Sequence, residues 1–138
     1  NEDYGDPESD ISRFSRIFAL GGSTNRFTVT LEPELPPGTY NRYNSTDTQA
    51  LGMLLTNAVG RLISEYMAEM LWHPMGAENQ AYWLTDTDHM EMAFAGLNAI
   101  ARDYAKLGEI YRLGGLLMAI ELCQRNGCRR LLLLTRRI

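Results

Sequence analysis

One stretch of the chain, residues 46–71, constrains the fold more than any other. Its apolar residues recur at the i, i+3 and i+4 spacing of an amphipathic α-helix, and few polar residues interrupt them. Thr46 and Gln49 have the spacing of an N-terminal capping box, and Pro74 stops the helix shortly after residue 71. The pattern therefore predicts one long helix, buried over most of its circumference. Its expected core residues are Leu55, Val59, Leu62 and Ile63.

The segment before this helix is expected to hold one short helix and one strand. Apolar residues at helical spacing follow two capping residue types and predict a helix over residues 10–20. Residues 21–24 form a turn, since their glycines and serine match no phosphate-binding motif. Residues 26–32 alternate between apolar and polar types, which predicts a β-strand. The side chains expected to face a core are Phe27, Val29 and Leu31.

Two more helical patterns follow the turn at residues 73–80. The first spans about residues 88–107 and starts with a capping-box spacing of Asp88 and Glu91. The second runs from residue 109 to a stop signal at residues 126–127. Residues 128–138 hold four leucines between arginine pairs, and this short run fits a strand or a helix equally well.

These elements predict a mainly α protein. The expected architecture is a long-helix hairpin or small bundle with a short N-terminal helix and one or two edge strands. Residues 1–10 are acidic and contain glycine and proline, so we expect a flexible arm there. Residues 11–138 are expected to form a single mainly helical domain or a fragment of a larger domain, since the sequence does not begin with methionine.

Charge and cysteine content limit the classes of partner. The net charge of −4 gives no overall support for binding to nucleic acid, although arginines concentrate in residues 125–138. No run approaches the roughly 18 apolar residues of a membrane-spanning helix, so no membrane insertion is expected. Cys123 and Cys128 have neither a disulfide framework nor a zinc-ligand spacing, which indicates reduced thiols in an intracellular protein.

Acid, base and metal-ligand residue types are densest at residues 86–91. The group comprises Asp86, Asp88, His89 and Glu91. Carboxylates at the start of a helix accept hydrogen bonds from its free amides, so we interpret Asp86 and Asp88 as capping residues. A metal-dependent hydrolase centred on the four residues is a second interpretation. Because no specific motif supports it, we predict no catalytic residue, no metal ligand and no cofactor.

The predicted strand at residues 26–32 has no clear partner in the chain. An unpaired strand edge readily accepts a strand from another polypeptide, and the preference for arginine over lysine favours contact surfaces. We therefore predict an interface made of aromatic, apolar and arginine side chains. The candidates are Arg26, Phe27, Val29, Leu31, Tyr40, Arg42, Tyr43, Arg129, Arg130, Arg136 and Arg137.

Taken with the charge pattern, this interface predicts a non-enzymatic structural or assembly component. A processed segment or subunit of a larger shell, such as a viral capsid, is one form of it. The expected partners are other protein chains, identical or different. The alternative is a small helical nucleic-acid-binding or regulatory module that uses the arginine-rich C-terminus.

Overall fold

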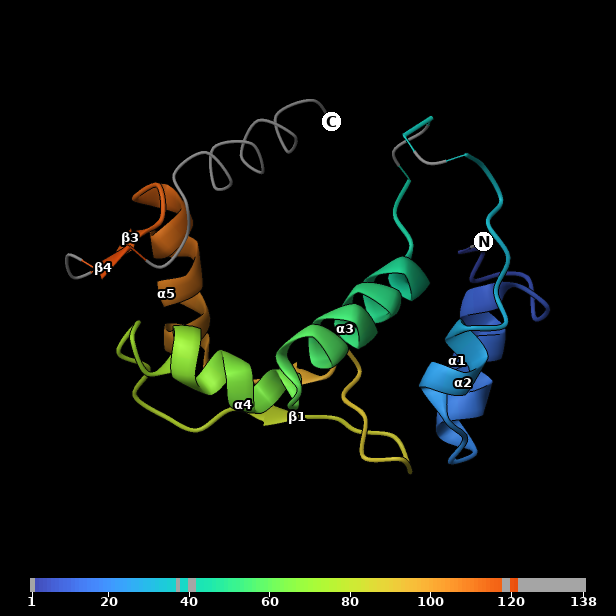
Figure 1. The fold of residues 1–138 in the computed structure, drawn as a ribbon, viewed down its shortest axis with the longest axis horizontal. Helices are drawn as coiled ribbons and strands as arrows, with labels where there is room; N and C mark the ends of the chain where they lie inside the picture. Colours follow the sequence, from blue (N-terminus) through green and yellow to red (C-terminus); the bar gives the residue numbers. More distant parts are fainter. Residues whose placement is uncertain (1, 37, 40–41, 118–119, 122–138) are drawn as a thin grey trace. The chain divides into compact units, whose positions relative to one another are not determined.

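The computed structural model describes residues 2–36, 38–39, 42–117 and 120–121 of the chain. Figure 1 shows the order of its elements. The helices are α1 (Asp10–Ala19), α2 (Thr24–Thr28), α3 (Ser45–Val59), α4 (Ile63–Met67), the π-helix η1 (Ala68–Trp72) and α5 (Ala101–Arg112). The strands are β1 (Tyr82–Trp83), β2 (Leu97–Asn98), β3 (Leu116–Leu117) and β4 (Ile120–Glu121), which form the two-stranded sheets β1–β2 and β3–β4.

The chain divides into two compact units, which are described separately. The first comprises Asn1–Ile63 and Trp83–Leu97, and the second comprises Ser64–Tyr82 and Asn98–Ile138. The described chain is mainly helical, as the sequence predicts. None of the described helices combines the length and the apolar character that crossing a membrane requires.

Helix α1 confirms the short helix predicted over residues 10–20. The Ser9 hydroxyl accepts a hydrogen bond from a backbone amide of the first turn at 3.3 Å and so caps the helix. Ile11 and Phe14 lie one turn apart on the same face and are buried. The Phe14 ring makes edge-to-face contacts with Phe27 and Phe94, with centroid distances of 6.0 and 5.0 Å. These aromatic rings form part of the core of the first unit.

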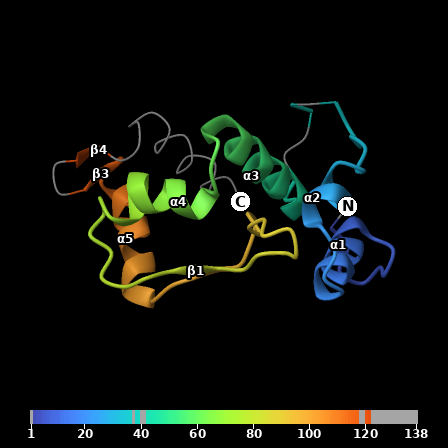
Figure 2. The same cartoon turned by 60° about the horizontal axis from the view of Figure 1, so that its bottom comes forward.

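The strand predicted over residues 26–32 is wrong, because Thr24–Thr28 form helix α2. The helix contacts α1 and α3, and Figures 1 and 2 both show it beside α1. Ser23 caps it, and the Thr28 hydroxyl donates to the backbone carbonyl of Thr24 at 2.9 Å. The Ser23 cap satisfies a free amide at the helix start, so the turn needs no partner strand. The alternation of residue types therefore did not indicate a strand here.

The single helix predicted over residues 46–71 is also wrong, because Gly60 divides it. Helix α3 ends at Val59, and Gly60 has a φ of 69°, the left-handed conformation that ends helices. The chain then continues as α4 and η1. At the start of α3, Asn44 rather than Thr46 is the cap, since its side-chain oxygen accepts a hydrogen bond from the Thr46 amide at 2.8 Å.

The core expected along this segment is mostly not buried. Of its four predicted residues only Ile63 is buried, and Leu55 is 36% exposed. Helix α3 instead buries four small or polar residues, Ser45, Thr46, Gln49 and Gly52. The prediction failed because the period of an apolar stripe does not say which face of a helix the rest of the protein covers.

The second unit has an apolar core around η1 and α5. Trp72, Met75 and Ile110 are 5%, 1% and 4% exposed and pack together. The Trp72 indole donates a hydrogen bond to the backbone carbonyl of Asn79 at 2.9 Å, so its polar atom is satisfied. Leu107 packs against this cluster one turn before Ile110 on α5.

Within the described residues, one helix that begins at residue 101 and a short strand pair replace the helices predicted over residues 88–107 and 109–126. Residues 118–119 and 122–126 of the second prediction lie outside the described residues. Residues 84–100 are not helical, and α5 runs from Ala101 to Arg112. Gly114 and Gly115 both have positive φ, and β3 then pairs antiparallel with β4. The registered pairs are Leu116 with Glu121 and Leu117 with Ile120. The alternatives for residues 128–138 lie outside the described residues.

Candidate functional site

A cleft of about 500 Å³ lies at the start of helix α3 in the first unit. The beginning of α1, the end of α2, the proline-rich segment after α2 and the first turns of α3 form its walls. One arginine, Arg42, lines it together with four carboxylates, which are those of Asp10, Glu32, Glu34 and Asp47. This excess of negative charge suits a cationic group or a hydrogen-bond donor.

Two of the four carboxylates are engaged with arginines. Arg42 donates hydrogen bonds to Glu34, one of them 3.2 Å long, and these bonds together with its charge lower the pKa of Glu34. Asp10 lies 3.7 Å from the guanidinium of Arg13. The carboxylates of Glu32 and Asp47 make no hydrogen bond or ion pair with the other residues that the structure describes. These two carboxylates are therefore the ones available to pair with a cationic ligand in the cleft.

Gln49 holds the start of α3 in place beside the cleft. It is 1% exposed, and its amide nitrogen donates to the Asn25 side chain at 3.0 Å and to the Glu91 carbonyl at 3.1 Å. Its oxygen accepts a hydrogen bond from the Ala93 amide at 2.8 Å. The side-chain oxygen and nitrogen are both satisfied, so Gln49 joins α2, α3 and residues 91–93. The capping-box role predicted for Gln49 is therefore wrong.

Asp86 ties a loop of the first unit to the start of α2. Its Oδ2 accepts hydrogen bonds from the amide and the hydroxyl of Thr24, both at 2.8 Å. Its Oδ1 accepts hydrogen bonds from the amides of Asp88 and Met90, both at 3.0 Å. Burial raises the pKa of Asp86, but these hydrogen bonds outweigh burial and leave its pKa lowered. Asp86 thus accepts a free first-turn amide of α2, whose N-cap is Ser23, and not one of a helix that begins at residue 88.

The other members of the predicted acid and base group have separate partners. Glu91 is buried, and its Oε2 accepts the Ile63 amide at 2.7 Å at the start of α4. Asp88 lies 3.7 Å from Arg26, and His89 is exposed with a φ of 59°. Among the described residues, no group of three or more His, Cys, Asp or Glu side chains could hold a metal ion. The geometry does not bring the four residues of the hypothetical metal site together.

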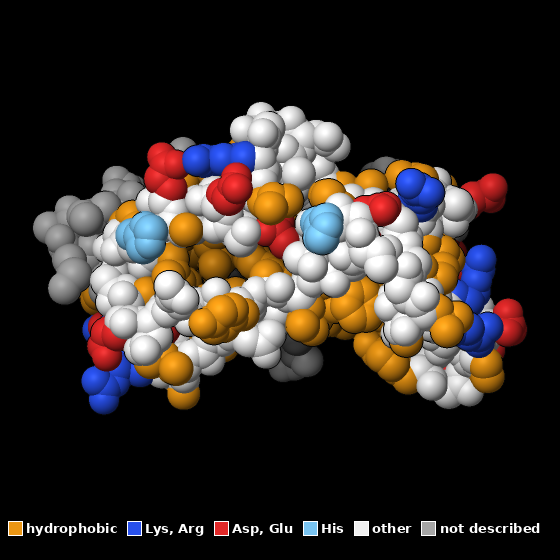
Figure 3. Space-filling model, turned by 90° about the horizontal axis from the view of Figure 1, so that it is seen from below, with side chains coloured by type: hydrophobic (Ala, Val, Ile, Leu, Met, Phe, Trp, Pro, Cys, Tyr) orange, Lys and Arg blue, Asp and Glu red, His pale blue; other side chains and the backbone are white. Residues whose placement is uncertain are grey.

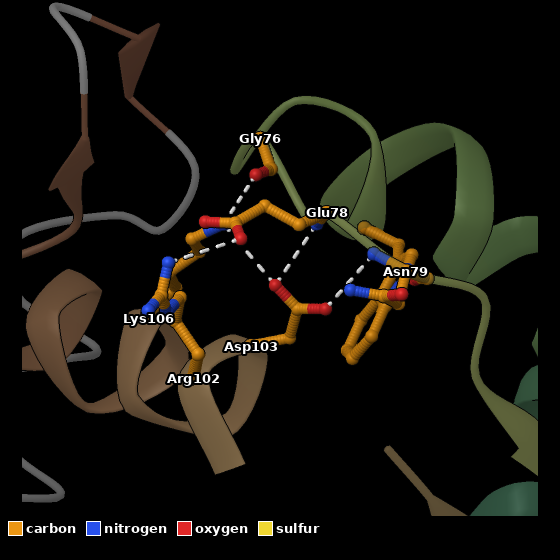
Figure 4. A network of polar contacts seen from close by, with 7 residues as sticks. Gly76, Glu78, Asn79, Arg102, Asp103 and Lys106 are labelled. Atoms are coloured by element: carbon orange, nitrogen blue, oxygen red, sulfur yellow. Dashed lines mark hydrogen bonds and ion pairs between the residues drawn. The ribbon is translucent and has the colours of Figure 1, made fainter. Parts of the chain in front are cut away.

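Asp103 organises a polar network in the second unit (Figure 4). It is fully buried and accepts the amides of Glu78 and Asn79 at 2.9 and 3.1 Å and the Lys106 ammonium at 3.1 Å. The hydrogen bond from the Glu78 amide is the largest of the causes that lower the pKa of Asp103. Lys106 also donates to the Glu78 carboxylate at 3.1 Å. The network fixes the chain after η1 on the first turns of α5.

The residues predicted to form an interface lie in several different environments. Phe27 is buried, whereas Val29 and Tyr43 are 71% and 73% exposed. Arg42 and Leu31 line the cleft, and the Arg26 side chain is 84% exposed. The remaining candidates, Tyr40, Arg129, Arg130, Arg136 and Arg137, lie outside the described residues.

Sequence reasoning did not find the cleft carboxylates. A usable signal was the Glu32-Pro33-Glu34 run, where prolines hold an acidic segment outside regular structure. Asp47 in the first turn of α3 was not singled out, because a carboxylate at that place is a common helix-start residue. The four carboxylates converge only because α1, α2 and α3 pack together.

The fold of the chain is similar to that of a solved protein from Bacillus anthracis, provisionally named a 6-aminohexanoate-dimer hydrolase. The TM-score is 0.78 with 24% sequence identity, and the match covers 92% of this chain and 36% of that one. No family model matches the sequence. The similarity to the solved structure shows a shared fold.

A curated protein, the 6-aminohexanoate-dimer hydrolase of Paenarthrobacter ureafaciens, is 28% identical to this chain over 124 residues. The match covers 83% of this chain and 31% of that protein. The chain therefore spans about a third of the length of both similar proteins.

These similarities overturn the prediction of a non-enzymatic structural or capsid component. Both similar proteins are named as hydrolases, and neither name describes a shell subunit or a nucleic-acid-binding module. The prediction that the chain has no enzymatic role is wrong for the same reason. The interface argument depended on an unpaired strand at residues 26–32, but that segment begins with the end of helix α2 and holds no strand.

Proposed function

We propose that this chain is part of a hydrolase that cleaves the amide bond of short linear amides such as the 6-aminohexanoate dimer. The observation that carries the proposal is the 28% identity over 124 residues to a protein of that name. The similar fold at a TM-score of 0.78 supports it. The rest of the catalytic domain corresponds to the two thirds of each similar protein that this chain does not span.

The acidic cleft at the start of α3 is the proposed substrate contact. A linear 6-aminohexanoate dimer carries an ammonium group at one end, an amide in the middle and a carboxylate at the other end, because both termini ionise at neutral pH. The negative charges of Glu32 and Asp47 attract the ammonium end and repel the carboxylate end. The cleft would thus orient the substrate along one direction.

A chimera tests the proposed reaction. This chain replaces the matching segment of the P. ureafaciens hydrolase, and the release of free amine from the dimer is measured. We expect hydrolysis above that of buffer alone. A chimera that folds, as judged by its circular dichroism and a cooperative thermal transition, but releases no amine would refute the proposed reaction.

Substitutions in the cleft test the proposed orientation of the substrate. Glu32→Gln and Asp47→Asn should each raise KM for the dimer by up to about fivefold, since a partly exposed ion pair contributes about 0.2–1 kcal/mol. The KM for an N-acetylated dimer, which has no ammonium group, should stay unchanged. Glu8→Gln is the matched control, because Glu8 is an exposed carboxylate of the same unit outside the cleft. Equal effects on both substrates would contradict the orientation.

A further inference from the structure

Helix α3 presents its apolar stripe to solvent. Leu51 and Leu54 are each 64% exposed and Leu55 is 36% exposed, and Ala58 is also exposed. These four residues have the i, i+3, i+4, i+7 spacing of a helix face that normally packs into a core. Hydrophobic side chains reach the surface elsewhere as well, as the face drawn in Figure 3 shows. The stripe differs from scattered exposed residues because it is continuous over two turns.

The opposite face of α3 is fixed against the first unit, so the helix cannot simply turn its leucines inward. Gln49 makes three hydrogen bonds there, to Asn25, Glu91 and Ala93. A Cβ added to Gly52 would lie 2.3 Å from the Ala93 side chain, which shows how closely the two segments approach. Rotation of α3 would break these hydrogen bonds and bury a bulky leucine where only glycine fits.

The size of the stripe indicates what kind of partner covers it. It extends over about 10 Å of helix, at about 1.5 Å per residue. A stable dimer of separate chains buries about 800 Å² on each partner, more than a two-turn stripe can offer. A neighbouring element of the same fold needs no such area, because other contacts already hold it in place. The similar hydrolases contain about two thirds of their length beyond the region that this chain matches.

We infer that the Leu51, Leu54, Leu55 and Ala58 stripe of α3 is the contact surface for an apolar element of the remaining part of the hydrolase fold. This inference rests on the proposed function, because it takes the missing element from the hydrolases that the chain resembles. The polar face of α3 positions the acidic cleft, and the apolar face would join that cleft to the rest of the catalytic domain.

The test compares one double variant, Leu51→Glu with Leu54→Glu, in two settings. In the 138-residue chain the variant should leave the thermal midpoint unchanged, because both side chains are already exposed. In the chimera with the P. ureafaciens hydrolase it should lower the midpoint by about 5 °C or more, because charges would be buried against an apolar surface. Leu20→Glu is the control, since Leu20 is 81% exposed outside the stripe, and it should have no effect in either setting.

Three results would overturn the inference. Loss of stability in the isolated variant chain would mean that the stripe is already covered within the chain. A dimer of the isolated chain in light scattering that the double variant abolishes would mean that a second copy covers it. An unchanged midpoint in the chimera would mean that no element covers it.

A second measurement applies if the chimera fails to fold. The chain and the remaining part of the P. ureafaciens hydrolase are then expressed together as separate polypeptides. Co-purification that the double variant reduces at least tenfold, and Leu20→Glu does not, supports the inference. No co-purification overturns it.

The two proposals can fail separately. If the double variant destabilises the chimera but the chimera releases no amine, the contact surface is supported and the proposed reaction is refuted. If the chimera hydrolyses the dimer and the double variant leaves its thermal midpoint unchanged, the proposed reaction is supported and the contact surface is refuted.

Discussion

Helix α5 buries an apolar side chain, whereas helix α3 buries only small or polar residues. Helix α5 places Ile110 and Leu107 in the core around Trp72, and its buried carboxylate, Asp103, is satisfied by hydrogen bonds. Helix α3 buries Gln49 and three other small or polar residues, and it exposes its leucines. The second unit thus contains a core that can stabilise α5 within the described chain. The first unit holds α3 by specific hydrogen bonds and leaves the apolar face of that helix exposed.

The difference shows that a helix can be positioned without burying its apolar stripe. Hydrogen bonds to buried polar groups are directional, so a side chain such as Gln49 can set the orientation of a helix. Burial of apolar area contributes more free energy but depends little on direction. We therefore expect the stability of α5 to fall when a buried apolar side chain is truncated. The stability of α3 should fall when the close packing or the hydrogen bonds of its polar face are disturbed.

The largest expected difference between the two helices comes from truncating one aliphatic side chain in each. Ile110→Ala should destabilise the second unit by about 2–5 kcal/mol, because it leaves a cavity beside Trp72 and Met75. Leu54→Ala should change stability by less than about 0.5 kcal/mol, because Leu54 is 64% exposed. Native-state hydrogen exchange of α5 and α3 amides measures both. A larger loss for Leu54→Ala would show that α3 buries its stripe within the chain.

A pair of glycine substitutions should have opposite signs in the two helices. Gly52→Ala should destabilise the first unit by about 1–3 kcal/mol, because the new methyl group would lie 2.3 Å from the Ala93 side chain. Gly108→Ala should stabilise α5 by about 0.5–1 kcal/mol, because nothing lies within 4 Å and alanine favours a helix. Chemical denaturation of both variants measures the difference. A neutral Gly52→Ala would contradict the close approach of α3 to residue 93.

The smallest expected effect is the pH dependence that Asp103 gives to the stability of the second unit. The pKa of Asp103 is lowered in the folded chain, so its carboxylate stabilises the second unit above about pH 4, near the pKa of an unfolded aspartate. This contribution should disappear as the pH falls through the lower folded pKa. Asp103→Asn should destabilise the second unit near neutral pH and flatten the acid-dependent loss of protection in α5. Amides of α1, in the other unit, serve as the internal control, and an unchanged acid profile for α5 would contradict the role of Asp103.

Local sequence signals determined the elements whose boundaries depend on near neighbours. The helix at α1 followed from a capping serine and an apolar spacing over ten residues, and both are properties of adjacent residues. The strong helical pattern after residue 45 was also correct in type. Its division at Gly60 was readable in principle, because glycine is the residue that most easily takes the left-handed conformation.

The candidate site could be predicted only in its parts. Asp47 was recognisable as an acid in a first helical turn, and residues 32–34 as two acids on either side of a proline. Their convergence with Asp10 into one cleft requires the packing of α1, α2 and α3. The sequence spacing of these residues carries no information about that packing.

The tertiary structure alone decided which face of α3 is inside and what the carboxylates at residues 86–91 do. Asp86 bonds to Thr24, 62 residues away, and Gln49 bonds to Glu91 and Ala93, 42 and 44 residues away. The periodicity of the sequence indicated the apolar stripe of α3. It could not determine which face is buried, because that depends on hydrogen-bond partners and on a close approach at Gly52 that arise only when distant segments meet.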